Sequence, residues 1–182
     1  MSVQTWKETL YSSVTDAVQI SNTVTETIMI PDTAIPARYW YSGRTLKYVL
    51  RGALSNVITT PGTLTLRARL GGVAGTLIVA SAALTLNVAA QTNSQVNIEF
   101  MLVCRAAGWS ATSGTLFATG QANLGLSAAT QGRVDMIPAS APAPVTTIDL
   151  TSASIVSLTA QFSVATAPTN LLINHATIES SN

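Results

Sequence analysis

The chain contains 182 residues with a formal net charge of +1, and only 9% of its residues are charged, compared with about 25% in an ordinary globular protein. This near-neutral balance excludes strong electrostatic attraction to nucleic acid or membranes, so we expect no specific nucleic-acid partner and no membrane partner. The length corresponds to one domain, and the single cysteine, Cys104, excludes a disulfide within the chain.

Residues 1–26 are polar and show no strong periodicity, which predicts an extended N-terminal arm. The first residues lack a basic stretch followed by an apolar one, so no secretory signal is expected. Two aromatic residues of the arm, Trp6 and Tyr11, need apolar surroundings. They either pack on their own domain or dock on a neighbouring subunit, and the sequence leaves both alternatives open.

The following residues, 27–182, are predicted to form a single β-domain, because apolar and polar residues alternate in short segments. In Thr63–Leu70, leucine or alanine occupies every second position, which places these residues on one face of a β-strand. Similar segments recur between turn signals rich in glycine, proline and asparagine. The predicted strands cover residues 27–30, 46–53, 63–70, 76–79, 84–88, 96–104, 114–121, 155–165 and 171–178. This spacing predicts an all-β, antiparallel, jelly-roll-like sandwich of about eight strands.

The longest uncharged stretch lies between Arg69 and Glu99. About 20 apolar residues can cross a membrane as a helix, but glycine, threonine, serine and asparagine interrupt this stretch. Alternation at residues 84–88 favours two strands joined by a small-residue turn at residues 80–83. An alanine-rich helix is the alternative.

A second unusual stretch, residues 123–144, is rich in alanine, serine and glycine and ends in the alternating proline segment 138–144. Alternating prolines favour an extended polyproline conformation. A connection of this length is uncommon inside a compact domain. We therefore expect a surface excursion between the strands that flank it.

Few residues in this chain can support catalysis. The single histidine, His175, lies on a predicted strand, and Cys104 lies in another apolar strand segment. A catalytic histidine needs a nucleophile and an orienting carboxylate that converge on it, and the carboxylates are spread along the chain without the clustering of a metal site. Residues 71–75 are glycine-rich but lack the lysine and the following helix of a phosphate loop. We expect no enzyme activity, no cofactor and no metal.

Every charged residue in the range 33–98 is positive. On the predicted strands, Lys47 shares one face with Arg51, and Arg67 shares one face with Arg69. If these two strands pair as a hairpin, the four cations form one basic face. Such a face either is solvated and protects the sheet against aggregation, or contacts an acidic protein surface, with nucleic acid as a third alternative.

The segments Thr45–Gly52, Thr60–Gly72 and Gly114–Gly120, with the apolar strand before the last of them, resemble a family of small virion structural proteins of tailed bacteriophages. The resemblance covers residues 20–122 and, more loosely, residues 145–178, and it includes no catalytic signature. It implies a jelly-roll or sandwich fold whose arm or termini serve in assembly. Several such proteins decorate the capsid exterior, often as trimers, and related folds occur in tail fibres and baseplates.

The resemblance implies a non-enzymatic head decoration (cement) protein, made in the host cytoplasm and located in the virion, on the capsid exterior. The expected partners are the major capsid protein and further copies of this chain, with a homotrimer favoured. A protein that binds the assembled shell but not its loose subunits stabilises the shell by its binding free energy.

Aromatic and basic residues are the expected contacts, because interfaces are enriched in aromatic residues and arginine. Trp40 belongs to the aromatic loop 39–41 and is expected at a subunit interface. The alternative function is a tail-fibre, baseplate or receptor-binding module, in which Trp40, Tyr41 and Trp109 stack on sugars. The expected protein-interface residues are Trp6, Tyr11, Trp40, Lys47, Arg51, Arg67 and Arg69.

Overall fold

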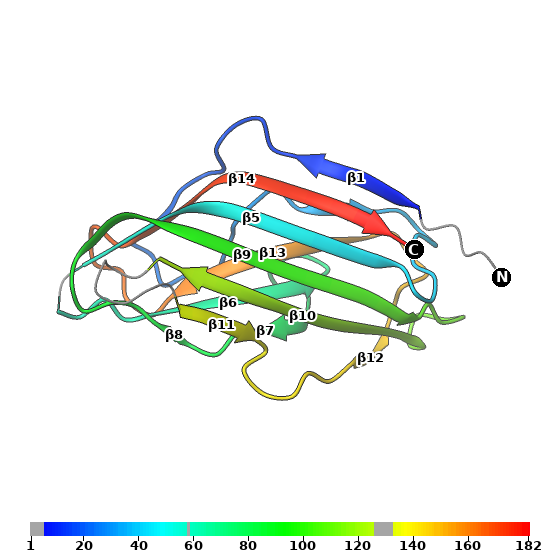
Figure 1. The fold of residues 1–182 in the computed structure, drawn as a ribbon. Helices are drawn as coiled ribbons and strands as arrows, with labels where there is room; N and C mark the ends of the chain where they lie inside the picture. Colours follow the sequence, from blue (N-terminus) through cyan, green and yellow to red (C-terminus); the bar gives the residue numbers. More distant parts are fainter. Residues whose placement is uncertain (1–5, 58, 126–132) are drawn as a thin grey trace.

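The computed structural model describes residues 6–57, 59–125 and 133–182, and every regular element in these ranges is a β-strand. The strands form two antiparallel sheets that pack face to face (Figure 1). The expected all-β sandwich is therefore confirmed. Within the described ranges, no helix is long and apolar enough to span a membrane.

The first sheet has the strand order β1-β14-β5-β9-β10-β11, with β2 paired to β14 and β12 paired to β10. Its central strands run side by side in Figure 1. The strands of this sheet are β1 (Lys7–Ser12), β2 (Ile20–Ser21), β5 (Thr45–Asn56), β9 (Gln91–Ala106), β10 (Gly114–Leu124), β11 (Arg133–Ile137), β12 (Val145–Ile148) and β14 (Asn170–Ser181).

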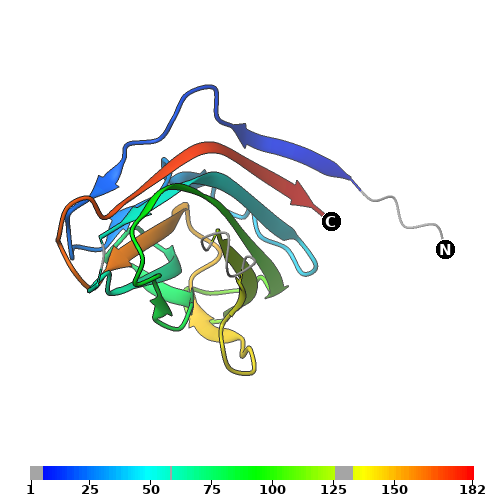
Figure 2. The ribbon, with the colours of Figure 1, turned by 60° about the vertical axis from the view of Figure 1, so that its left-hand side comes forward.

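The second sheet has the strand order β3-β13-β6-β7, with β4 paired to β13 and β8 paired to β6. Figure 2 shows β1 at the outer edge of the first sheet, close to the N-terminus. The strands of the second sheet are β3 (Thr27–Ile28), β4 (Thr33–Ile35), β6 (Thr63–Leu70), β7 (Thr76–Ala80), β8 (Leu84–Thr85) and β13 (Ser154–Phe162).

The core lies between the sheets and consists of the inward-facing residues of both. Leu64, Leu66 and Ala68 of β6 are fully buried, as their alternation with polar residues predicts. They belong to one hydrophobic cluster with Tyr48 and Phe100 of the first sheet. Because burial of each large apolar side chain contributes about 1.5–3 kcal/mol, this cluster is the main source of stability.

The segments with strong alternation of apolar and polar residues form strands as predicted, whereas several short strands could not be predicted from this alternation. Strand β6 has the expected bounds, and the stretch between Arg69 and Glu99 contains strands rather than a helix. The strands that the sequence did not predict are β1, β2, β4 and β11, each two to six residues long, whereas β12 begins at Val145, where a strand was expected after the excursion. Strands this short form because a longer neighbour offers backbone partners, and the sequence does not reveal that neighbour.

The expected excursion at residues 123–144 has regular structure at both of its sides. Residues 123–124 complete β10, and residues 133–137 form β11, which pairs with β10. Residues 138–144 contain no regular element. Residues 126–132, the remaining part of this expectation, lie outside the described residues.

The hairpin considered for β5 and β6 does not form. β5 pairs with β14 and β9, whereas β6 pairs with β13, β7 and β8. The connection after β5 carries the chain to the other sheet, and Thr59 and Gly62 within it have φ angles of +70° and +72°. Alternation fixes which face of a strand is buried but not which strand lies beside it.

Gly52 in β5 lies opposite a bulge in β14, where the register shifts between Ile173 and His175. The backbone of β14 approaches so closely that a Cβ atom at position 52 would overlap the carbonyl oxygen of Leu172. Both strands lie inside the first sheet, with neighbours on either side, so neither can move away without disturbing other pairs.

We expect Gly52→Ala to lower the free energy of unfolding by about 3 kcal/mol, because the added methyl group forces β5 and β14 apart. Chemical denaturation followed by circular dichroism measures this change. The control is Ala53→Ser on the opposite face of the same strand, which should change the free energy by less than about 1 kcal/mol. Equal stability of Gly52→Ala and wild type would contradict the prediction.

Candidate functional site

The basic residues that the sequence placed on one face lie on two. Lys47 and Arg51 are exposed on the outer face of the first sheet. Arg67 and Arg69 lie on the outer face of the second sheet. The expectation of one four-cation face is wrong because β5 and β6 belong to different sheets.

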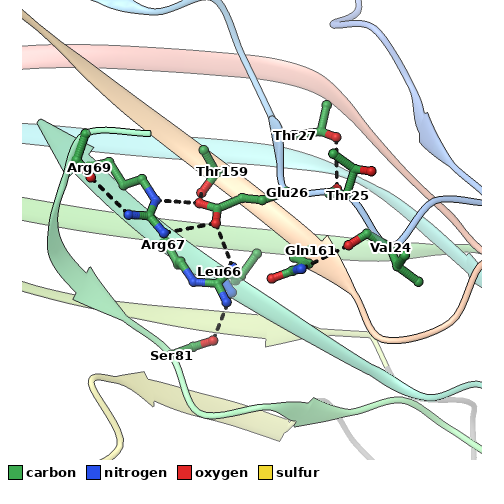
Figure 3. A network of polar contacts seen from close by, with 11 residues as sticks. Val24, Thr25, Glu26, Thr27, Leu66, Arg67, Arg69, Ser81, Thr159 and Gln161 are labelled. Atoms are coloured by element: carbon green, nitrogen blue, oxygen red, sulfur yellow. Dashed lines mark hydrogen bonds and ion pairs between the residues drawn. The ribbon is translucent and has the colours of Figure 1, made fainter. Parts of the chain in front are cut away.

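A single carboxylate, that of Glu26, pairs with both arginines of β6 (Figure 3). Arg69 binds Glu26 through two hydrogen bonds, with Nε 2.6 Å from Oε1 and Nη2 3.0 Å from Oε2. Arg67 adds an ion pair of 3.3 Å, and the Thr159 hydroxyl donates a hydrogen bond of 2.6 Å to Oε1. The side chains of Arg67 and Arg69 are only 18% and 19% exposed.

Strand pairing brings Glu26 to this position. It directly precedes β3, whose pairing with β13 places Ile28 opposite Thr159. A second tie lies further along the same segment, where the Ser157 hydroxyl donates a hydrogen bond of 2.6 Å to Asp32. The chain before and after β3 is therefore held to the outer face of the second sheet by two carboxylates.

The charges of this cluster support each other. Burial raises the pKa of Glu26, but hydrogen bonds from Arg69 and Thr159, together with the charges of Arg67 and Arg69, outweigh burial and hold its pKa below the ordinary value. The hydrogen bond to Glu26 raises the pKa of Arg69 despite its burial. Pairing with Glu26 and partial burial commit Arg67 and Arg69 mainly to the fold, and one carboxylate balances one of their two positive charges.

Trp40 lies in the core and is only 3% exposed, so the expectation that it lies at a subunit interface is wrong. Its ring packs edge-on against Tyr39, with centroids 5.9 Å apart. Arg44 lies between the rings of Tyr39 and Tyr41, with its guanidinium carbon 4.2 Å and 4.1 Å from their centroids. This stack fixes the aromatic loop, and Tyr41 keeps part of its surface in solvent.

The first described part of the expected arm belongs to the first sheet. Strand β1 pairs with β14, and Tyr11 packs against the core, so it contacts its own domain. Trp6 lies just before β1, and half of its surface is in solvent. Trp6 is therefore accessible to a partner, whereas Tyr11 is committed mainly to the fold.

Five exposed large apolar side chains lie along residues 6–28, which we call the N-terminal edge. Val14 and Val18 are 95% and 89% exposed. The sequence does not predict that these valines are exposed, since the polar segment that carries them lacks strong periodicity. The exposed large apolar residues of the N-terminal edge are Trp6, Val14, Val18, Val24 and Ile28.

A groove accompanies the N-terminal edge between the two sheets. It consists of two hollows of about 310 and 440 Å³ that share Tyr11 and Pro31 in their walls. Its walls are mostly apolar, and the charged residues that line it, Glu8, Asp16 and Asp32, are all acidic. The groove therefore suits a partner surface that is apolar at its centre and basic at its rim.

Among the described residues, no three histidine, cysteine or acidic side chains come together as metal ligands. Cys104 is buried in the first sheet, and burial raises the pKa of its thiol. His175 is exposed and pairs in register with Arg51. Because the histidine lies in solvent and the thiol lies in the core, they cannot act as a pair.

Comparison with known proteins finds only a distant structural likeness. No family model matches the chain, and no curated protein matches it. Among solved structures it is similar to the CBM2 module of the evolved Dit of Lactobacillus casei BL23 phage J-1, with 9% sequence identity and a TM-score of 0.40, covering 97% of each chain. A likeness this distant does not assign a function.

We expect stability to fall as the pH drops below about 4.5, the ordinary pKa of glutamate. The folded-state pKa of Glu26 is lower than the unfolded one, so its contribution is present above this pH and is lost during acidification. Glu26→Gln should lower the free energy of unfolding at pH 7 by about 1–3 kcal/mol and weaken the pH dependence between about pH 5 and 3.

Denaturation at a series of pH values measures both effects. The control is Glu179→Gln, which removes the more exposed ion pair with Lys7 and should cost less than about 1 kcal/mol. An unchanged acid profile in Glu26→Gln would show that Glu26 does not hold the second sheet.

Proposed function

We propose that this chain is a non-enzymatic structural protein of a bacteriophage virion and docks on a neighbouring virion protein through its N-terminal edge. The observation that carries the proposal is the row of exposed apolar side chains beside an apolar groove. The resemblance to small virion structural proteins gives the biological setting. A role in assembly fits a surface that lacks reactive chemistry but offers apolar contact area.

Apolar exposure of this kind favours association. Monomeric proteins rarely expose large continuous apolar patches, and burial contributes about 25 cal/mol per Å² of apolar surface. Burial of Val14 and Val18 carries no cost of desolvating polar groups, because their side chains are entirely apolar. In a virion the contact repeats at many positions, so a modest affinity per site becomes strong attachment when copies are linked.

Tail location is our first choice, as a fibre, baseplate or receptor-binding module. Head decoration was expected to use a basic face of four cations that meets the shell. Two of these cations, Arg67 and Arg69, are paired with Glu26. Head decoration on the capsid exterior is the second candidate, favoured by Lys47 and Arg51, which remain exposed. For head decoration, the resemblance implies the major capsid protein and two further copies of this chain as partners, and both remain predictions.

Cryo-electron microscopy of the intact virion, with the chain located in the density, tests the proposal. We expect density for the chain on the tail, with residues 6–28 against a neighbouring protein. Density on the capsid lattice would support the second candidate. Absence from the particle, or an N-terminal edge that faces solvent, would contradict the proposed docking.

We expect Val14→Asp combined with Val18→Asp to prevent incorporation into virions, because two carboxylates would be buried without partners against an acidic groove. Quantitative mass spectrometry of purified particles measures incorporation. The melting temperature should change by less than about 3 °C, since both valines lie in solvent.

The matched control is Val88→Asp, which places the same charge on a valine that is 65% exposed in another loop. This variant should enter virions at the wild-type level. Equal incorporation of the double variant and the control would refute the N-terminal edge as the docking surface.

A further inference from the structure

A third hollow lies at the end of the sandwich where β9 turns into β10. Its volume is about 420 Å³, and its walls include Arg38, Trp40, Trp109 and Thr151. Trp109 is 99% exposed, in contrast to Trp40 in the same wall. Leaving an entire indole ring in water sacrifices the apolar burial that usually justifies a tryptophan, so this position calls for a ligand.

The turn that carries Trp109 is held by its own hydrogen bonds. The Ser113 hydroxyl oxygen accepts from the backbone N–H groups of Trp109 at 2.7 Å and Ser110 at 2.9 Å. Gly108 has a φ angle of +77°, and a Cβ atom there would collide with Ser113 and Gly114. The ring is thus presented by a turn that already has its shape, which reduces the entropy lost on binding.

The opposite wall is equally fixed. Arg38 has a φ angle of +58°, a conformation that costs a non-glycine residue about 1 kcal/mol or more and concentrates at functional positions. Its backbone N–H donates to the carbonyl oxygen of Thr151 at 3.0 Å. Asp149 holds that segment by accepting hydrogen bonds from the Thr151 N–H and hydroxyl, both at 2.8 Å, and from the Ser152 N–H at 3.2 Å.

The polar groups left over match a ring that carries several hydroxyl groups. Arg38 is exposed, and its guanidinium has five N–H donors. A pyranose ring combines an apolar C–H face, which stacks on an indole, with hydroxyl groups that accept from such donors.

From this arrangement we infer that the pocket between Arg38 and Trp109 binds a saccharide. Trp109 stacks on the sugar ring, and Arg38 donates to its hydroxyl or carboxylate oxygens. The inference goes beyond the proposed function and does not depend on it. The pocket shares no lining residue with the groove of the N-terminal edge, so either can fail while the other holds.

The test uses the isolated full chain on a glycan array that carries neutral hexoses, N-acetylhexosamines, uronic acids and sialylated glycans. The strongest saccharide is then titrated by calorimetry against wild type and variants. We expect Trp109→Ala to weaken binding about tenfold or more, and Arg38→Gln to weaken it by about fivefold. The matched control is Trp6→Ala, a half-exposed tryptophan on the N-terminal edge, which should bind as wild type does.

A local readout separates a direct contact from a change in fold. In ¹⁵N-labelled protein, the indole resonance of Trp109 should shift during the titration while that of Trp6 stays in place. Circular dichroism melting should confirm that each variant is folded. Absence of saccharide binding by the wild type, or full binding by folded Trp109→Ala, would overturn the inference.

Discussion

The carboxylate of Glu26 is the contact on which the arrangement of the N-terminal third depends. It binds two arginines and a threonine that would otherwise leave polar groups on the outer face of the second sheet. Since an unpaired, half-buried arginine is costly, the segment before β3 must lie across that face. This requirement turns a polar, weakly patterned stretch of chain into a fixed part of the sandwich.

The groove and the exposed valines follow from that constraint. With Glu26 and Asp32 held on one sheet and β1 paired on the other, the chain between them must cross the open side of the sandwich. The crossing covers the core only partly, because few apolar residues are present to fill the gap. Val14 and Val18 remain outside, in solvent, and they form the centre of the surface proposed for docking.

Strand faces could be predicted from the sequence, whereas partners could not. Alternation in Thr63–Leu70 identified β6 and its buried face, since one face of a sheet must be apolar. The partner of Arg69 could not be found, because Glu26 lies 43 positions away in the chain and no periodic pattern joins them. Trp40 was wrongly predicted to lie at an interface because aromatic residues are common both in cores and at interfaces. Which of these environments a given residue occupies depends on how the sheets pack around it.

The pairing of β1 with β14 also decides where anything joined to this protein will lie. The Asn182 N–H donates to the carbonyl oxygen of Trp6 at 3.3 Å, and Ser181, Thr45 and Val103 stand side by side in neighbouring strands. Both ends of the described chain therefore lie at the end of the sandwich where β9 turns into β10 (Figure 1). A purification tag or surface anchor at either terminus is tethered near the Trp109 turn, whereas a label in the exposed loop at residues 165–167 occupies the far end.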